Sequence, residues 1–102
     1  MAEIVWSEPS LADLDAIADY IALENVEAAR ALVRQIFQHI EQLAVFPESG
    51  VKPPELGNTR YRQIIESPCR IFYRYDGNSV IILHVMRSER QLRKSRLRRK
   101  TK

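Results

Sequence analysis

The side chains with the clearest chemical potential gather in the C-terminal half of the chain. His84 stands within a run of Ile, Leu and Val residues, and histidine is the usual proton-transfer side chain near neutral pH. Arginines that can bind phosphate or carboxylate through forked hydrogen bonds precede and follow it: Arg62, Arg70, Arg74, Arg87, Arg90 and Arg93. Three tyrosines lie among the first three of these arginines and could stack on bases: Tyr61, Tyr73 and Tyr75. These residue types are compatible with a phosphate-binding surface and with acid–base chemistry at His84.

Structural explanations compete with both interpretations. A single histidine in a strand is more often packed or hydrogen-bonded than catalytic, and no nucleophile–base arrangement can be derived for His84 from spacing alone. Alternate residues of a strand point to opposite faces, so Arg70 and Arg74 are expected on one face and Tyr73 and Tyr75 on the other. The tyrosines can therefore belong either to a binding surface or to the hydrophobic core.

Residues 60–87 must position these side chains, and their pattern predicts three successive β-strands. Two turn signals, Ser67-Pro68 and Asp76-Gly77-Asn78, divide runs that are rich in Ile, Val, Phe and Tyr. The last run is apolar at both parities and is expected to be a central strand. The middle run alternates Arg70, Phe72 and Arg74 with apolar residues, which predicts a strand with one wetter face.

The preceding residues predict one strand and two helices. Residues 3–6 form a short β-rich run, and an apolar stripe at helical spacing then extends to about Leu23. Asn25 is a suitable cap for a second helix, which Pro47 should terminate. Because the connection is short, the helices should pair as an antiparallel hairpin on one face of the sheet. The predicted fold is a two-layer α+β domain of order β-α-α-β-β-β with a mainly antiparallel sheet.

Composition limits the other possibilities. A chain of 102 residues with 45% hydrophobic residues can form one domain with its own core. Cys69 is the only cysteine and is expected to be a small packed residue, and the two histidines are not spaced as zinc ligands. Neither a metal nor another cofactor is predicted. No segment resembles a membrane helix or a secretory signal, so we expect a cytoplasmic protein that does not bind membranes.

The charge is divided sharply along the chain. Residues 1–86 carry seven Lys/Arg and twelve Asp/Glu, whereas residues 87–102 carry nine Lys/Arg and one Asp/Glu. A block of like charge usually marks an interaction segment. We expect a folded domain over residues 1–96 and a basic, flexible tail over residues 97–102.

Short motifs occur in a recognisable order over nearly the whole chain. They are residues 4–9 followed by Leu11, Asp13 and Leu14; Ala28 and Ala29; residues 40–43 with Phe46, Pro47 and Gly50; Arg62; residues 70–73; and residues 81–87 with Arg90. No single motif is specific, but the ordered set resembles the RelE/ParE superfamily of bacterial type II toxins, the toxic halves of toxin–antitoxin pairs that stabilise plasmids. The fold that this resemblance implies agrees with the one that the residue patterns predict.

The resemblance leaves the target open, because this superfamily divides by activity. RelE-like members cleave mRNA at the ribosome with basic residues and a Tyr or His near the C-terminus, whereas ParE-like members poison DNA gyrase by binding it. After Met86 this chain has no Tyr or His, and Ser88 stands where a catalytic arginine is expected. General acid catalysis typically contributes about 10²–10⁴-fold to a rate. The resemblance therefore implies a ParE-like gyrase inhibitor with no catalytic residues of its own.

The resemblance also implies partners and site residues. An acidic antitoxin and DNA gyrase are the expected partners, and operator DNA would be reached only through the antitoxin. The expected target- or antitoxin-binding residues are Arg62, Arg70, Arg74, Arg87, Arg90 and Arg93. In the alternative, a ribosome-dependent mRNA endonuclease, the catalytic candidates are Arg70, His84, Arg87, Arg90 and Lys94. A second alternative is a non-toxic protein of this fold that regulates transcription together with the antitoxin.

Overall fold

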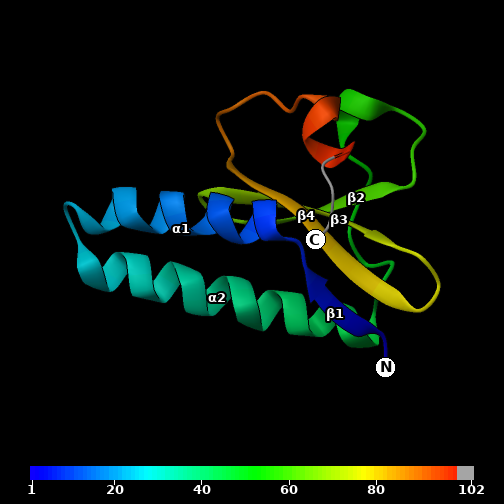
Figure 1. Cartoon of the computed structure of the whole chain (residues 1–102), viewed down its shortest axis with the longest axis horizontal. Coiled ribbons are helices and arrows are strands. Elements are labelled where there is room, and N and C mark those ends of the chain that lie inside the picture. The colour runs from blue at the N-terminus through cyan, green and yellow to red at the C-terminus, as the bar shows by residue number, and fades with distance from the viewer. Residues whose placement is uncertain (99–102) are drawn as a thin grey trace.

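The computed structural model describes residues 1–98. Four strands and two α-helices follow one another in the order β-α-α-β-β-β (Figure 1). Their bounds are β1 Glu3–Trp6, α1 Glu8–Ala22, α2 Val26–Val45, β2 Tyr61–Glu66, β3 Cys69–Tyr75 and β4 Ser79–Arg87, with 3-10 turns at Pro54–Leu56 and Lys94–Arg98. The predicted α+β fold is therefore confirmed. Residues 99–102 of the expected tail lie outside the described residues.

The helices begin and end at residues that the sequence marks. The Ser7 side chain caps α1 by accepting the backbone N–H three residues later, and Pro9 lies in the first turn, where its missing N–H is not needed. Asn25 caps α2 in the same way. α2 ends just before Pro47, which disfavours helical geometry at the residue preceding it. Residues 23–25 alone connect the helices, which lie side by side as an antiparallel hairpin (Figure 1).

The strands form one sheet in the order β1-β4-β3-β2. β1 pairs with β4 in parallel, and the other two pairings are antiparallel. β4 is therefore internal, and its residues from Ser79 to Met86 are all buried. This confirms that the third strand of the 60–87 region is central.

The helical hairpin covers one face of the sheet. Ile36, Ile40 and Leu43 of α2 are at most 1% exposed, and they share a hydrophobic cluster with Tyr73 of β3. Tyr75 packs against the same cluster. Burial of each large apolar side chain contributes about 1.5–3 kcal/mol. Tyr73 is thus a core residue and Tyr75 is partly buried at the margin of the core, so the two do not form a stacking surface.

The opposite face of the sheet is also covered, and the prediction of a wetter face was wrong. Phe72 is fully buried and Arg70 is 8% exposed. Leu92 and Leu97, two apolar residues of the basic C-terminal segment, join Phe72 in a second hydrophobic cluster. Figure 1 shows the segment after β4 on the side of the sheet away from the helices. The alternation of polar and apolar residues in β3 could not show that a segment distant in the sequence covers this face of the sheet.

The packed part of the chain extends past the expected boundary at residue 96. Residues Lys94–Arg98 form a 3-10 turn, and Leu97 within it is 2% exposed. Burial of a leucine contributes about 1.5–3 kcal/mol relative to exposure. Leu97 therefore belongs to the folded domain.

Arg70 holds the Pro54–Leu56 turn against this second face. Its guanidinium donates to both carboxylate oxygens of Glu55 at 2.7 Å. It also donates to the side-chain oxygen of Gln63 at 2.6 and 3.0 Å, and it lies 4.9 Å from the centre of the Phe72 ring. The hydrogen bonds from Arg70 lower the pKa of the Glu55 carboxyl from 4.5 to about 2.

The loop after α2 is fixed at Gly50. Tyr73 Oη accepts the Gly50 N–H at 3.0 Å and donates to the Pro47 carbonyl at 2.8 Å, while Arg62 donates to the Gly50 carbonyl at 2.8 Å. A Cβ at position 50 would lie 2.6 Å from Tyr73 Oη and 2.7 Å from the backbone oxygen of Gln63. Both distances are too short for carbon–oxygen contact, so this close approach requires glycine.

We expect Gly50→Ala to lower the free energy of unfolding by about 1–3 kcal/mol, the usual cost of overpacking. Urea denaturation measures this, with Ser49→Ala, an exposed neighbour, as the control. Adding Tyr73→Phe should not restore the lost stability, because the Gln63 oxygen and Tyr73 Cε1 remain 2.7 and 2.8 Å from the new methyl group and the two hydrogen bonds of the hydroxyl are lost. Equal stability of Gly50→Ala and the wild type would contradict this account of the loop.

The Glu55–Arg70 pair should make stability depend on pH. Because folding lowers the Glu55 pKa from 4.5 to about 2, the contribution is present above pH 4.5 and is lost as the pH falls toward 2. The Glu55 side chain is 25% exposed, and solvent screening reduces the contribution to about 1–2 kcal/mol. The free energy of unfolding of the wild type should exceed that of Glu55→Gln by this amount at about pH 6. The two free energies should become equal as the pH falls toward 2. The exposed Glu41→Gln is the control, and a gap that does not change with pH would refute the assignment.

Candidate functional site

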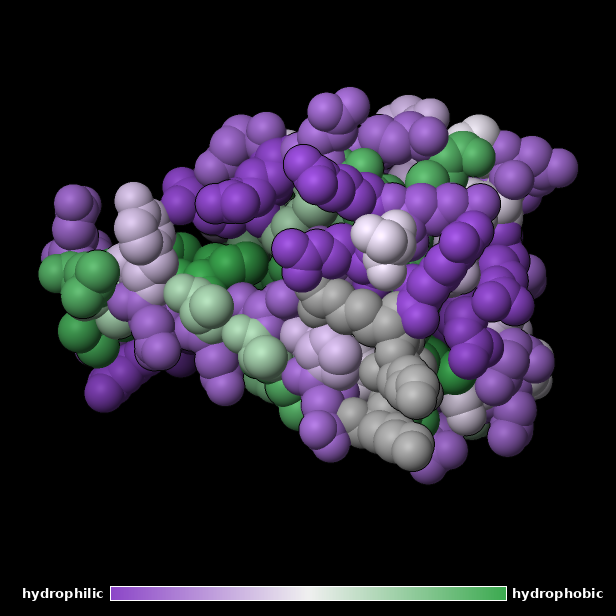
Figure 2. All heavy atoms as spheres, turned by 45° about the horizontal axis from the view of Figure 1, so that its top comes forward, coloured by the Kyte–Doolittle hydropathy of each residue, from purple (hydrophilic) through white to green (hydrophobic). Residues whose placement is uncertain are grey.

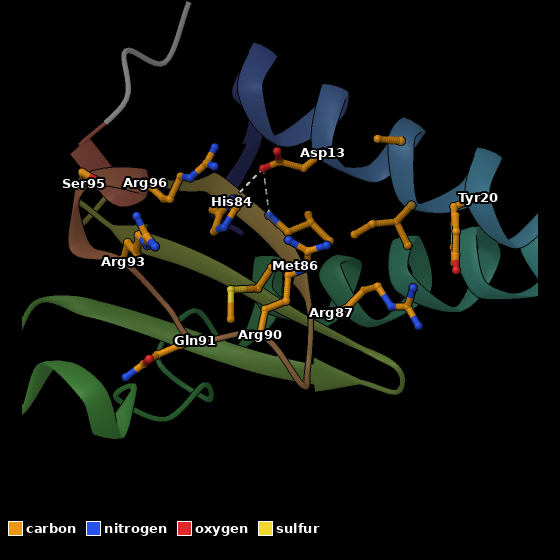
Figure 3. Close-up of a pocket in the computed structure, with 13 residues that line it drawn as sticks. Asp13, Tyr20, His84, Met86, Arg87, Arg90, Gln91, Arg93, Ser95 and Arg96 are labelled. Carbon is orange, nitrogen blue, oxygen red and sulfur yellow. Dashed lines mark hydrogen bonds and ion pairs between the residues drawn. The ribbon is translucent and has the colours of Figure 1, made fainter.

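A groove of about 1030 Å³ lies between α1, the end of β4 and the segment that follows β4. Its charged and polar walls, hereafter the basic groove, include residues from all three elements (Figure 3): Asp13, Tyr20, His84, Arg87, Arg90, Gln91, Arg93, Ser95 and Arg96. Four arginines at a spacing of three residues thus line one cavity. Such a surface suits a ligand with several carboxylates or phosphates.

Apolar side chains also line the basic groove: Ala16, Ile17, Val85 and Met86. Figure 2 shows a band of hydrophilic residues across the upper part of one face, above an apolar patch beside the helical hairpin. A surface that combines cationic walls with apolar contacts fits a protein segment that carries both acidic and apolar side chains.

The arginines of the segment after β4 hold their positions because two leucines of the same segment are buried against the sheet. Leu92 and Leu97 are 6% and 2% exposed in the second hydrophobic cluster. Arg90, Arg93 and Arg96 are exposed, and none of them forms an ion pair with a carboxylate of residues 1–98. Their charge therefore remains available to a ligand.

His84 is held at the inner end of the groove by Asp13 of α1. His84 Nδ1 lies 2.6 Å from Asp13 Oδ2, and the same oxygen accepts the Val85 N–H at 3.2 Å. Figure 3 shows both contacts as dashed lines from Asp13. The His84 ring also stacks on Phe72, with centroids 5.8 Å apart and planes 18° apart. With 8% of its side chain exposed, His84 is mainly a structural residue.

Arg87 lies at the outer end of the groove, next to Tyr20 of α1 (Figure 3). Its guanidinium carbon is 5.1 Å from the centre of the Tyr20 ring, within the range of cation–π attraction. Arg87 Nε also lies 3.0 Å from a carboxylate oxygen of Glu89. About a third of the Arg87 side chain remains exposed.

The four predicted binding arginines of the strands do not share one surface. Arg62 and Arg87 lie on the helix-covered face and Arg70 and Arg74 on the opposite face, because their cross-strand partners belong to different hydrophobic clusters. Arg62 and Arg70 are engaged by the Gly50 carbonyl and by Glu55 respectively. Of these four arginines, Arg87 alone lines the basic groove.

The alternative catalytic set is likewise divided. Arg70 is buried against Glu55, outside the groove that contains His84, Arg87 and Arg90. Lys94 is exposed and does not line the groove. The structure therefore brings together three of the five residues.

Sequence reasoning missed five of the nine charged and polar groove residues: Asp13, Tyr20, Gln91, Ser95 and Arg96. The regular spacing of the arginines from Arg87 onward was a usable signal for Arg96. Asp13 had no such signal, because His84 and Val85, which it contacts, are 71 and 72 residues away in the chain.

The described residues offer no metal site. Within residues 1–98, no group of three or more His, Cys, Asp or Glu is arranged to hold an ion. Cys69 is fully buried as expected, and burial raises the pKa of its thiol to about 11, so the thiol stays protonated at neutral pH. In the same part of the chain, neither helix combines the length and the hydropathy needed to span a bilayer.

Comparison with known proteins agrees with the fold and the sequence motifs. The family described as "ParE toxin of type II toxin-antitoxin system, parDE" matches residues 4–92. Toxin RelE2 of Caulobacter vibrioides is 30% identical over 87 residues, which are 85% of this chain and 92% of that protein. The Sinorhizobium fredii protein Y4kP is 34% identical over 88 residues, 86% of this chain and 90% of its own length.

A solved structure described as "Chromosomal ParDE TA system from P. aeruginosa" is also similar. It superposes with a TM-score of 0.71 at 29% identity, covering 87% of this chain and 98% of the other. The match of the family to most of the chain, together with the two relatives and the shared fold, leads to one conclusion. The chain belongs to the ParE toxin family of type II toxin–antitoxin systems, within the RelE/ParE superfamily.

Proposed function

We propose that this protein acts in the cytoplasm by binding DNA gyrase and blocking replication, and that a cognate acidic antitoxin neutralises it. Membership of the ParE toxin family supports the general class. We propose binding and not catalysis because the side chains that catalysis would require are already bonded to other residues of the protein.

The observation that carries this choice is the separation of Arg70 and His84. Arg70 is 8% exposed and bonded to both oxygens of Glu55, and His84 is held through Nδ1 by Asp13. A ribonuclease needs charge stabilisation and proton transfer at one phosphate. The exposed arginines of the basic groove can bind an acidic surface without meeting at a single phosphate.

The antitoxin is proposed on the same electrostatic grounds. The folded part before β4 ends is acidic, so the excess positive charge is confined to residues after Met86. An acidic protein segment laid along the basic groove would neutralise Arg87, Arg90 and Arg93 and cover the apolar lining. We infer that neutralisation works by occupying this groove.

A second candidate function, mRNA cleavage at the ribosome, has one observation in its favour. A carboxylate that accepts a hydrogen bond from one ring nitrogen of a histidine can hold the other nitrogen as a base. Asp13 and His84 form such a pair at the wall of an arginine-lined groove. The gyrase proposal remains first because Arg70, a member of the catalytic set, lies outside that groove.

We expect the purified protein to inhibit supercoiling by gyrase and to provoke double-strand breaks in DNA. The double variant Arg90→Glu/Arg93→Glu should need at least about tenfold more protein for half-inhibition, since interface charges typically contribute above 1 kcal/mol each when they are paired. Arg30→Glu/Arg34→Glu on exposed positions of α2 is the control for the change in charge.

Unchanged supercoiling at excess wild-type protein would refute the gyrase target. Expression in cells then separates the two candidates: gyrase poisoning induces the SOS response, whereas ribonuclease activity leaves cleaved mRNA without it.

Co-expression with a cognate acidic antitoxin should give a stable complex. Reversing the charge at Arg87, Arg90 and Arg93 should weaken that complex by at least about tenfold in dissociation constant, most strongly at low salt. The same reversal at Arg30, Arg34 and Lys52, all exposed elsewhere, should have little effect. A complex insensitive to the groove variant would exclude the electrostatic mechanism of neutralisation.

A further inference from the structure

We propose that Asp13 is a positioning residue of the basic groove, whose carboxylate fixes the end of β4 so that Arg87 and Arg90 face the ligand. The structural half of this proposal stands on the contacts of Asp13 alone. Its functional half rests on the proposed inhibition of gyrase.

The need for such a residue follows from the unequal lengths of β1 and β4. β1 pairs with β4 only from Ser79 to Ile82, and the Ser7 N–H then bonds to the Ile82 carbonyl. Residues 83–87 continue the strand with no neighbouring strand on that side. An unpaired edge leaves backbone groups without ladder partners.

Asp13 fills this gap from α1. Its Oδ2 accepts the Val85 N–H at 3.2 Å, which replaces the ladder bond that β1 is too short to make. The same oxygen lies 2.6 Å from His84 Nδ1. One carboxylate oxygen thus contacts two consecutive residues of the strand.

An irregularity in β4 makes this double contact possible. Ile82 pairs with Tyr73 and His84 pairs with Phe72, so Leu83 is an extra residue in the ladder. Such a bulge turns the side chains that follow it. The His84 ring consequently stacks on Phe72, in the layer that also contains the leucine anchors of the C-terminal segment.

Tyr20 provides a second contact two turns further along α1. Its ring lies 5.1 Å from the guanidinium carbon of Arg87, the last residue of β4. Arg90 follows in a turn closed by its N–H to the Arg87 carbonyl at 3.0 Å. The position of Arg90 therefore depends on how α1 holds β4 at Asp13 and Tyr20 (Figure 3).

The decisive variant is Asp13→Ala, which removes the oxygen that accepts the Val85 N–H and contacts His84 Nδ1. Asp15→Ala makes the same change at an exposed position of α1 and is the matched control. Tyr20→Leu tests the second contact at a residue that is 61% exposed, so the core is left intact. Its control is Leu23→Ala, at an exposed residue just after α1 that does not line the groove.

The first measurement is NMR of the isotope-labelled free protein, following the Val85 amide and the Arg87 Nε–H. In Asp13→Ala we expect exchange of the Val85 amide with solvent to accelerate at least about tenfold, and the Arg87 side chain to become more mobile. The amides of Ile71 and Val80, in the core, should not change. Unaltered Val85 and Arg87 signals would overturn the proposal.

The second measurement is the concentration for half-inhibition of gyrase, expected to rise about tenfold in Asp13→Ala and Tyr20→Leu but not in the two controls, as for loss of a charge-assisted contact. NMR changes with unaltered inhibition would overturn the functional half. If the wild type does not inhibit gyrase, the proposed function fails, and the NMR comparison alone decides whether Asp13 positions the arginines.

Discussion

β4 is apolar on both of its faces, so one layer of helices cannot remove it from water. The helical hairpin covers Val80, Ile82 and Val85, while Ile81, Leu83 and Met86 point to the other side. At about 25 cal/mol per Å² of apolar area, leaving that second set exposed would cost several kcal/mol, a large part of the stability of a small domain. The second cover is supplied by the Pro54–Leu56 turn and the segment after β4. The position of the basic segment is therefore a consequence of burying the central strand.

This requirement explains how a strongly charged segment acquires fixed positions. Six of the twelve residues from 87 to 98 are Lys or Arg, and they would repel one another in a free tail. Leu92 and Leu97 offset that repulsion by packing against Phe72 and its neighbours. The charges then lie on the outer side and Arg87, Arg90, Arg93 and Arg96 line one groove. Folding energy and ligand binding thus depend on the same short segment.

The elements of the fold were predictable because they depend on local patterns. The strand formed by the apolar run of residues 79–87, the helical stripes and the cap at Asn25 are all confirmed by the structure. The site was predictable only in part, because its geometry depends on pairings between distant residues. Arg70 was expected at a binding surface, yet it finds Glu55 in a loop 15 residues away, and Asp13 finds His84 across 71 residues. The isolated Leu92 and Leu97 were visible in the sequence, but nothing local indicates which surface they cover.

The distribution of arginines also bears on the kind of function that the fold supports. A catalytic arginine must lie within a fraction of an ångström of its working position, which usually requires hydrogen bonds from neighbouring side chains. Arg70 has such support, but its partner is the Glu55 carboxylate, so its charge is already neutralised. Arg90 and Arg93 have the opposite character, since they are exposed and form no ion pair with a carboxylate in the described part of the chain. Side chains of that kind gain free energy from a broad acidic partner more than from one strained phosphate. The constrained arginine, Arg70, therefore has a structural role, whereas the exposed Arg90 and Arg93 lie at a surface that is suited to binding.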